Sequence, residues 1–216
     1  MTRLPAAKRR EQLLDCAAEV FSEFGYARAT TSQLAKAAGV TEPIIYRHFK
    51  SKRDLFVALI KRTGDDTIVQ WEEDLADAKN HVERLRMLLA DNPMVDPRGA
   101  TAYRVIIQAM TEVEDEMIHA AVSEHMNRLH TFLTNELVKG QEEGIVVTRV
   151  SADVIGWMLI DIALGYGVSA ALRIPGHDRE GMGSAIQSII ARMMFRKEAL
   201  QMLPDVAKPP EVQDND

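Results

Sequence analysis

Residues 30–52, TTSQLAKAAGVTEPIIYRHFKSK, contain two short stretches of helically spaced apolar residues on either side of Gly39. The spacing predicts one helix over about 31–38 and a second over about 42–48. A glycine between them gives the backbone the freedom that a short turn between two steeply crossing helices requires. The segment 30–49 is therefore predicted to be a helix-turn-helix.

The residues that begin each helix support this prediction. Thr30 and Gln33 have the spacing of a capping box. Thr41 can cap the second helix, and Pro43 lies in its first turn, where a missing N–H costs nothing. The apolar residues available to lock the helices together are Leu34, Ala35, Ala38, Val40 and Ile45. The residues left for the outer side of the second helix are Thr41, Glu42, Ile44, Tyr46, Arg47 and His48. In a helix-turn-helix, this second helix enters the major groove of duplex DNA.

The charge is distributed unevenly along the chain. The 216 residues carry a net charge of -6, which by itself argues against a nucleic-acid partner. Residues 1–56, however, hold ten Lys and Arg against six Asp and Glu, a net charge of +4, and the rest of the chain carries -10. A basic head on an acidic body suggests that only the head contacts a polyanion.

A long helix is predicted to follow the helix-turn-helix, capped by Ser51. Lys52 and Arg53 would lie at its N-terminus, where a cation is unfavourable on macrodipole grounds unless an anion such as a phosphate lies there. Simple solvation of both side chains is the alternative. The basic residues Lys8, Arg9 and Arg10 form either an ordinary polar face or an arm on the DNA.

The rest of the chain also has helical spacing, and no strand alternation is evident, so an all-α fold of about nine helices is predicted. Residues 154–172 are nearly all apolar or small, but Asp161 at their centre favours a helix packed against protein over a membrane span. One cysteine excludes an internal disulfide and a thiolate metal site, and favours a reducing, cytoplasmic compartment. The Pro-rich acidic tail, 204–216, is predicted to be disordered.

Residues 13–60, LLDCAAEVFSEFGYARATTSQLAKAAGVTEPIIYRHFKSKRDLFVALI, resemble the DNA-binding domain of the TetR (tetracycline-repressor-like) family. The resemblance covers roughly residues 7–67 and rests on many positions at fixed spacing, from Phe-x-x-x-Gly-Tyr to Ser-Lys. It implies an N-terminal three-helix DNA-binding domain over 7–67 and a helical effector-binding and dimerisation domain over 68–203.

The resemblance also implies roles for individual residues. Those expected to hold DNA phosphates are Thr31, Thr41, Tyr46 and Lys52. Those expected to face the groove are Gln33, Glu42, Pro43, Ile44, Arg47 and His48, and Thr30 belongs to the same surface. His48 could equally be a packing residue, and the ring of Tyr46 can pack while its hydroxyl contacts a phosphate.

The regulatory domain gives less specific signals. Aromatic and Met side chains of the middle helices are either core or the lining of a pocket for an apolar or aromatic effector: Trp71, Met87, Tyr103, Ile107, Met110, Met126, Phe132 and Trp157. The last two long helices carry too many apolar residues for one stripe, so they are the expected homodimer interface. The candidates there are Asp161, Tyr166, Ile186, Ile190 and Met193, with Asp161 as a hydrogen-bonded polar group more than a ligand-binding one.

Together these expectations predict that the protein is a homodimeric repressor, which a small-molecule effector releases from a palindromic operator. An enzyme is the rival class, because Glu116 and His119 form one Glu-x-x-His element, but a di-metal site needs two. No other catalytic motif occurs, so neither a metal nor a cofactor is expected. A third alternative, a helical ligand-binding or scaffolding protein that no longer binds DNA, is disfavoured by the intact segment 30–52.

Overall fold

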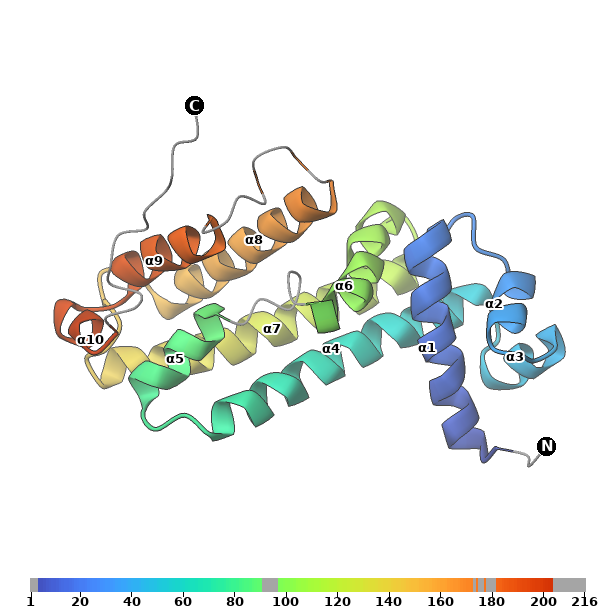
Figure 1. Ribbon diagram of the computed structural model, residues 1–216, viewed down its shortest axis with the longest axis horizontal. Coiled ribbons are helices and arrows are strands. Elements are labelled where there is room, and N and C mark those ends of the chain that lie inside the picture. The colour runs from blue at the N-terminus through green and yellow to red at the C-terminus, as the bar shows by residue number, and fades with distance from the viewer. Residues whose placement is uncertain (1–3, 91–96, 173, 175–176, 178–181, 204–216) are drawn as a thin grey trace. The chain divides into compact units, whose positions relative to one another are not determined.

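The computed structural model describes residues 4–90, 97–172, 174, 177 and 182–203, and these residues are mostly helical (Figure 1). In chain order the helices are α1 (Ala6–Phe24), α2 (Thr31–Ala37), α3 (Glu42–His48), α4 (Lys52–Ala76), α5 (His81–Ala90), α6 (Pro97–Ala109), the 3-10 helix η1 (Met110–Glu112), α7 (Glu116–Glu142), α8 (Ala152–Ala171), α9 (Met182–Met194) and α10 (Lys197–Gln201). The all-α prediction is confirmed. The predicted disordered tail lies outside the described residues.

The chain groups into two compact units. The first unit comprises Met1–Asp66 with Pro97–Asn127, and the second comprises Thr67–Asp96 with Arg128–Asp216. A single domain boundary near residue 67 was expected, which would place α6 and the start of α7 in the C-terminal domain. In the structure α6 belongs to the first unit and packs against α1, and the functional division near residue 67 stays a prediction. Helical periodicity indicates which face of α6 is apolar but not which helix covers that face.

An aromatic cluster at the centre of the first unit holds α1 to the start of α4. Phe21 and Phe56 are both fully buried and meet edge to face at 5.1 Å. Tyr26 stacks on Phe56 at 4.3 Å with an interplanar angle of 25°. Each such pair contributes about 0.5–1.5 kcal/mol beyond the burial of its area. α2 follows α1 and packs against it, and α3 packs against α2 (Figure 1), so this cluster fixes the base on which the helix-turn-helix rests.

α4 and α7 approach closely within the first unit at Gly64. A Cβ atom at this position would lie 2.7 Å from Nδ1 of His125, closer than unbonded heavy atoms pack. The side chain of His125 is buried. Glycine is a poor helix former, so Gly64 weakens α4 locally, but the absence of a Cβ atom allows α4 and α7 to pack closely at this position.

The core of the second unit explains why the last predicted helix is divided. Val146 and Phe195 form an isolated antiparallel bridge, in which the N–H of Val147 donates to Met194 O at 2.9 Å and the N–H of Arg196 donates to Ile145 O at 2.8 Å. These bonds take the backbone out of the helix, so that α9 ends at Met194 and α10 begins at Lys197. Helical spacing of apolar residues, which led us to expect long helices here, gives no sign of this break.

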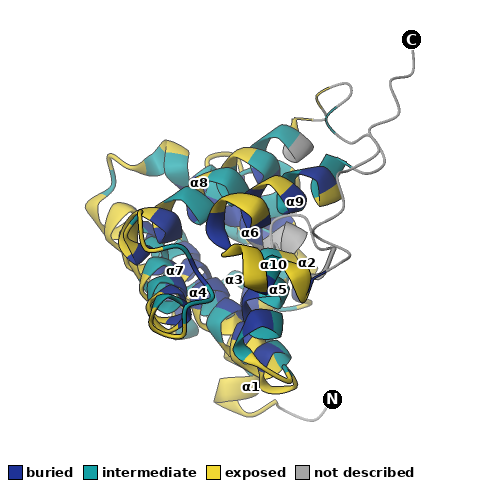
Figure 2. Cartoon of the chain, turned by 90° about the vertical axis from the view of Figure 1, so that its left-hand side faces the viewer, coloured by how far each residue is buried: buried dark blue, intermediate teal, exposed yellow. Residues whose placement is uncertain are grey.

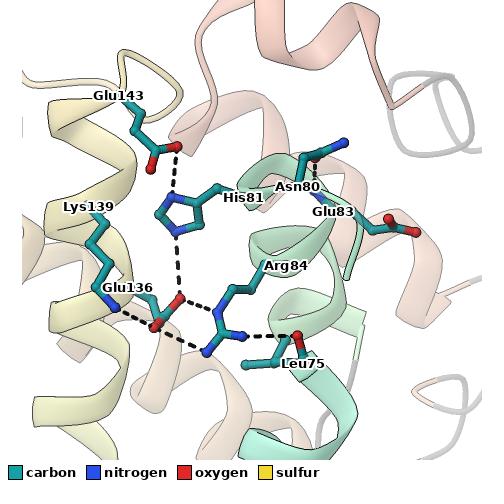
Figure 3. Close-up of polar contacts among 8 residues, drawn as sticks. All are labelled: Leu75, Asn80, His81, Glu83, Arg84, Glu136, Lys139 and Glu143. Carbon is teal, nitrogen blue, oxygen red and sulfur yellow. Dashed lines mark hydrogen bonds and ion pairs between the residues drawn. The ribbon is translucent and has the colours of Figure 1, made fainter. Parts of the chain in front are cut away.

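A buried carboxylate joins three helices of the second unit (Figure 3). The side chain of Glu136 on α7 is 5% exposed and accepts hydrogen bonds from Arg84 Nε at 2.6 Å and Lys139 Nζ at 3.2 Å. Arg84 on α5 also donates to Leu75 O, near the end of α4, at 2.9 Å. Burial alone would raise the pKa of Glu136, but the hydrogen bonds from Arg84 and Lys139 hold this pKa below its ordinary value.

α8 is partly uncovered within the described chain (Figure 2). By length and composition alone, Ala152–Ser169 could cross a membrane, and 28% of this window is buried. This helix was expected to pack against protein, and within the described chain it does so only in part. Val154 is 54% exposed, and Trp157 and Asp161 are also exposed. One side of α8 therefore still offers apolar surface to a partner.

Candidate nucleic-acid interface

The first helix of the helix-turn-helix has the cap that its sequence predicts. Thr30 Oγ1 accepts a hydrogen bond from the backbone N–H of Gln33 at 3.2 Å, and Gln33 Oε1 accepts one from the backbone N–H of Thr30 at 2.8 Å. This reciprocal pair is a complete capping box. After α2, Gly39 adopts a φ of 63°, in the left-handed region that glycine occupies without strain. Both local predictions are confirmed.

The second helix, α3, begins without the expected side-chain cap. Thr41 occupies the N-cap position, but its hydroxyl makes no capping hydrogen bond. Pro43 in the first turn lacks an N–H, so one of the donors that a cap would satisfy is missing. The exposed hydroxyl of Thr41 is thus not used to cap the helix, and its contact with a phosphate remains a prediction.

The orientation of α3 agrees with the sequence pattern. Ile45 is completely buried, and Phe49 just after the helix is also in the core. Four of the α3-region residues expected to contact DNA are exposed: Thr41, Pro43, Tyr46 and Arg47. Glu42, Ile44 and His48 are half-buried, so both interpretations of His48 stay open. α3 therefore presents a polar face to solvent from a helix anchored by one buried isoleucine.

A chain of side-chain contacts links α2 to this face. The Thr31 hydroxyl donates to Glu42 Oε2 at 2.8 Å, and the Tyr46 hydroxyl approaches Thr31 Oγ1 at 3.4 Å, a long contact. Thr31 and Tyr46, both predicted to hold a phosphate, are thus brought together. Glu42 lies beside them, and its carboxylate is positioned to repel a phosphate or to accept from the amino group of cytosine.

Replacing Glu42 with glutamine is expected to tighten binding to random-sequence duplex DNA by about two- to fivefold. The change removes one charge close to the phosphate path, where an interaction at 4 Å is worth about 1 kcal/mol in water. Fluorescence anisotropy with a labelled random duplex at about 100 mM salt measures the effect. Glu19→Gln, an exposed carboxylate of α1, is the control for net charge. Weaker binding by Glu42→Gln would show that this carboxylate supports the interface.

The basic residues near α1 and α4 have partners within the first unit. The Lys52 ammonium lies 4.6 Å from the centre of the Tyr26 ring and donates to Tyr26 O at 2.8 Å, so it is directed at the loop between α1 and α2. The Arg10 guanidinium lies 4.9 Å over the Phe49 ring. Lys8, Arg9 and Arg10 are part of α1 itself, which favours the polar-face interpretation over a free arm.

The residues expected to line an effector pocket occur in both units. In the first unit Tyr103 is buried, and Ile107, Met110 and Met126 are half-buried. In the second unit Trp71 is buried and its ring lies 5.4 Å from that of Phe132, and Met87 is half-buried. Trp157 is exposed and stacks on His130 at 4.4 Å. Trp157 therefore lies at a surface, which suits an interface better than a closed pocket.

The expected dimer residues differ in their exposure. Met193 is exposed, and so is Asp161, while Tyr166 and Ile186 are half-buried. Ile190 is buried within its own chain and packs in the core. The neighbouring Ile189, which was not among the expected dimer residues, is 55% exposed instead. Apolar residues fill several sides of α9, so the pattern alone does not distinguish the inward isoleucine from the outward one.

Comparison with known sequences adds independent information. The family model described as bacterial regulatory proteins, tetR family, matches residues 13–59. The HTH-type transcriptional activator FasR of Mycolicibacterium smegmatis is 29% identical over 134 residues, 54% of this chain and 61% of that protein. The fatty acid metabolism regulator protein of Bacillus subtilis is 27% identical over 149 residues, 67% of this chain and 77% of that protein. The nucleoid occlusion factor SlmA of Marinobacter nauticus is 32% identical over 139 residues, 62% of this chain and 68% of that protein. The matched region thus spans less than two thirds of FasR but more than two thirds of the other two.

Solved structures agree on the fold. A putative transcriptional regulator from Saccharomonospora viridis in complex with choline has a TM-score of 0.80 at 19% identity, covering 88% of this chain and all (100%) of that one. The regulator FadR from Bacillus subtilis in complex with stearoyl-CoA has a TM-score of 0.70 at 20% identity, covering 85% of this chain and 98% of that one. These TM-scores show that the arrangement of helices is shared, but at identities this low they do not show which ligand this chain binds.

Proposed function

Because the chain belongs to the TetR family of bacterial regulatory proteins, we propose that it is a homodimeric repressor that a small-molecule effector releases from a palindromic operator. As a member of this family it is a DNA-binding transcriptional regulator and not an enzyme. The finer points, namely repression, dimerisation and release, form the proposal. FasR, one of the relatives, is an activator by name, so the direction of regulation needs its own test.

The observation that carries the proposal is the exposed face of α3. Arg47 and Tyr46 extend from a helix whose buried anchor is Ile45, the arrangement that a recognition helix needs to enter a major groove. We propose that Thr31, Thr41 and Tyr46 contact phosphates, and that the groove-facing residues are Gln33, Glu42, Pro43, Ile44, Arg47 and His48. Thr30 positions Gln33 through the capping box.

Charge supports the same interface. The +4 head contains α3, while the remaining residues carry -10. A uniformly acidic protein would be repelled by DNA, whereas a basic head alone can release counterions from the phosphate backbone. We propose that the protein acts in the cytoplasm on chromosomal DNA, with the acidic body turned away from the duplex.

A dimer would place two copies of α3 on successive half-sites. Two-fold helix-turn-helix dimers bind half-sites about 34–36 Å apart. We propose that α8 and α9 form the interface, since the exposed apolar residues Val154, Trp157, Ile189 and Met193 lie on these two helices. Burying such residues against a second copy would remove apolar surface from water at roughly 25 cal/mol per Å².

The effector is proposed to be an apolar or aromatic molecule bound among the middle helices. It must bind the DNA-incompetent state more tightly, and a typical coupling is about 1–3 kcal/mol. Long-chain fatty acids and their CoA esters are the first probes, because the B. subtilis relative is named for fatty acid metabolism. A probe that lowers operator affinity by about fivefold or more would identify the class.

Binding to duplex DNA at several salt concentrations tests the core of the proposal. We expect the wild-type protein to enrich a palindromic sequence from a random duplex library, and log K to fall linearly with log salt. A transcription reporter carrying the selected duplex then distinguishes repression from activation. Failure to bind any duplex in a salt-sensitive way would contradict the assignment of α3 as a recognition helix.

A further inference from the structure

The start of α4 carries two neighbouring cations with different partners. Lys52 is directed at the loop between α1 and α2, and Arg53 is directed at the segment that precedes α7. Both lie where a helix dipole disfavours positive charge. Their contacts differ in number, burial and strength, and this difference decides which of them can bind another anion.

The Lys52 ammonium has no donor to spare. It has three N–H groups, and it lies within hydrogen-bond distance of the carbonyls of Tyr26 at 2.8 Å, Ala29 at 3.0 Å and Ala27 at 3.4 Å. The ring of Tyr26 covers it as well. A phosphate could bind Lys52 only at the expense of contacts that hold the loop between α1 and α2.

Arg53 is engaged far less. Its Nη1 donates to Asp115 Oδ2 at 3.1 Å, and the side chains are 47% and 28% exposed. A guanidinium has five N–H donors in a planar fork that suits phosphate oxygens. Exposed ion pairs of this kind contribute little to stability. An approaching phosphate can therefore take Arg53 from Asp115 at small cost.

Asp115 is held in place by its own helix. Its Oδ1 accepts the backbone N–H groups of Met117 at 3.0 Å and Ile118 at 3.3 Å, which caps the first turn of α7. The carboxylate cannot follow Arg53 toward a phosphate without giving up this cap. Any displacement of the first turn of α7 would carry Asp115 with it and change its hold on Arg53.

We propose that Arg53, in place of Lys52, is the cation at the start of α4 that contacts the DNA backbone, and that Asp115 competes with phosphate for its guanidinium. This inference rests on the proposed DNA-binding function and adds to it a regulated contact. The pair is an autoinhibitory link within the first unit, through which the position of α7 sets the affinity of the head for DNA.

Replacing Asp115 with asparagine tests the competition, because asparagine caps a helix about as well as aspartate. Asp115→Asn is expected to raise the affinity for a random duplex by about three- to fivefold. In an Arg53→Gln background the same change is expected to have no effect, as a double-mutant cycle requires. Arg53→Gln alone should reduce the slope of log K against log salt by about one per bound protomer, and Lys52→Gln should leave the slope unchanged.

The matched control is Glu124→Gln. Glu124 on α7 forms an ion pair with Lys61 on α4 at 2.8 Å. Glu124 lies nine residues after Asp115, and Lys61 lies nine residues after Lys52. Nine residues span about 14 Å along a helix, which is more than the Debye length of about 10 Å at 0.1 M salt. The charge of Glu124 is therefore largely screened from the start of α4. Equal affinities of Asp115→Asn and Glu124→Gln would overturn the inference while the wild type still bound DNA. A salt slope reduced by Lys52→Gln and unchanged by Arg53→Gln would overturn it too. If the wild type bound no duplex at all, the proposed function itself would fail.

Discussion

Replacing Arg84 with methionine is expected to lower the free energy of unfolding by about 3–5 kcal/mol, the cost of leaving a buried carboxylate without its main partner. Glu136 is nearly inaccessible, and Arg84 supplies two hydrogen bonds to it, from Nε at 2.6 Å and Nη2 at 3.3 Å (Figure 3). Methionine keeps most of the apolar stem, so the loss reports mainly the charge. Urea denaturation at pH 7, followed by circular dichroism, measures it.

Two variants and a pH series separate this mechanism from a loss of packing. Lys139 also binds Glu136 but is 59% exposed, so Lys139→Met should cost at most about 1 kcal/mol. Arg84→Met combined with Glu136→Leu should recover much of the loss, because a buried pair can be replaced by apolar residues almost neutrally. A double variant as unstable as Arg84→Met alone would assign the loss to packing.

The pH dependence has a defined sign. The pKa of Glu136 is held below its ordinary value, so its stabilisation is present above the pH at which glutamates of the unfolded chain titrate, about 4.3. That stabilisation is lost as the pH falls through the lower folded value. The difference between wild type and Arg84→Met should therefore be largest near pH 7 and shrink toward pH 4. A difference that stays constant over this range would contradict the role of the charge.

The features that sequence predicted well are those that depend on neighbours along the chain. The capping box of Thr30 and Gln33, the turn at Gly39 and the burial of Ile45 all involve residues a few positions apart. Periodicity and capping rules describe such local relations. They were sufficient to place α2 and α3 and to assign the outer face of α3.

The features that sequence missed depend on contacts between distant segments. Arg84 and Glu136 lie 52 positions apart, and Arg53 and Asp115 lie 62 apart. Nothing in a sequence pattern pairs these charges, so the phosphate contact was expected at Lys52, and the difference between its partners and those of Arg53 could not be predicted. The bridge between Val146 and Phe195 that ends α9 is a distant pairing of the same kind.

Replacing Arg47 with alanine is expected to weaken binding to the selected operator by about ten- to hundredfold per half-site, and binding to random duplex by only about two- to threefold. Arg47 is exposed on α3 and has no hydrogen-bond or ion-pair partner among the described residues. A guanidinium free of protein partners can bond O6 and N7 of guanine in the major groove, which is worth about 1–3 kcal/mol of discrimination. Anisotropy titrations on the two duplexes at equal salt give both affinities.

The comparison with Tyr46 makes this prediction specific to base reading. The Tyr46 hydroxyl lies beside Thr31 in the proposed phosphate site, so Tyr46→Phe should weaken binding to the operator and to random duplex by the same factor. Arg47→Lys should keep most of the random-duplex affinity and lose much of the discrimination, because an ammonium lacks the planar fork. If Arg47→Ala lowered both affinities equally, Arg47 would be a phosphate contact. Base recognition would then have to come from the other proposed groove-facing residues, which are Gln33, Glu42, Pro43, Ile44 and His48.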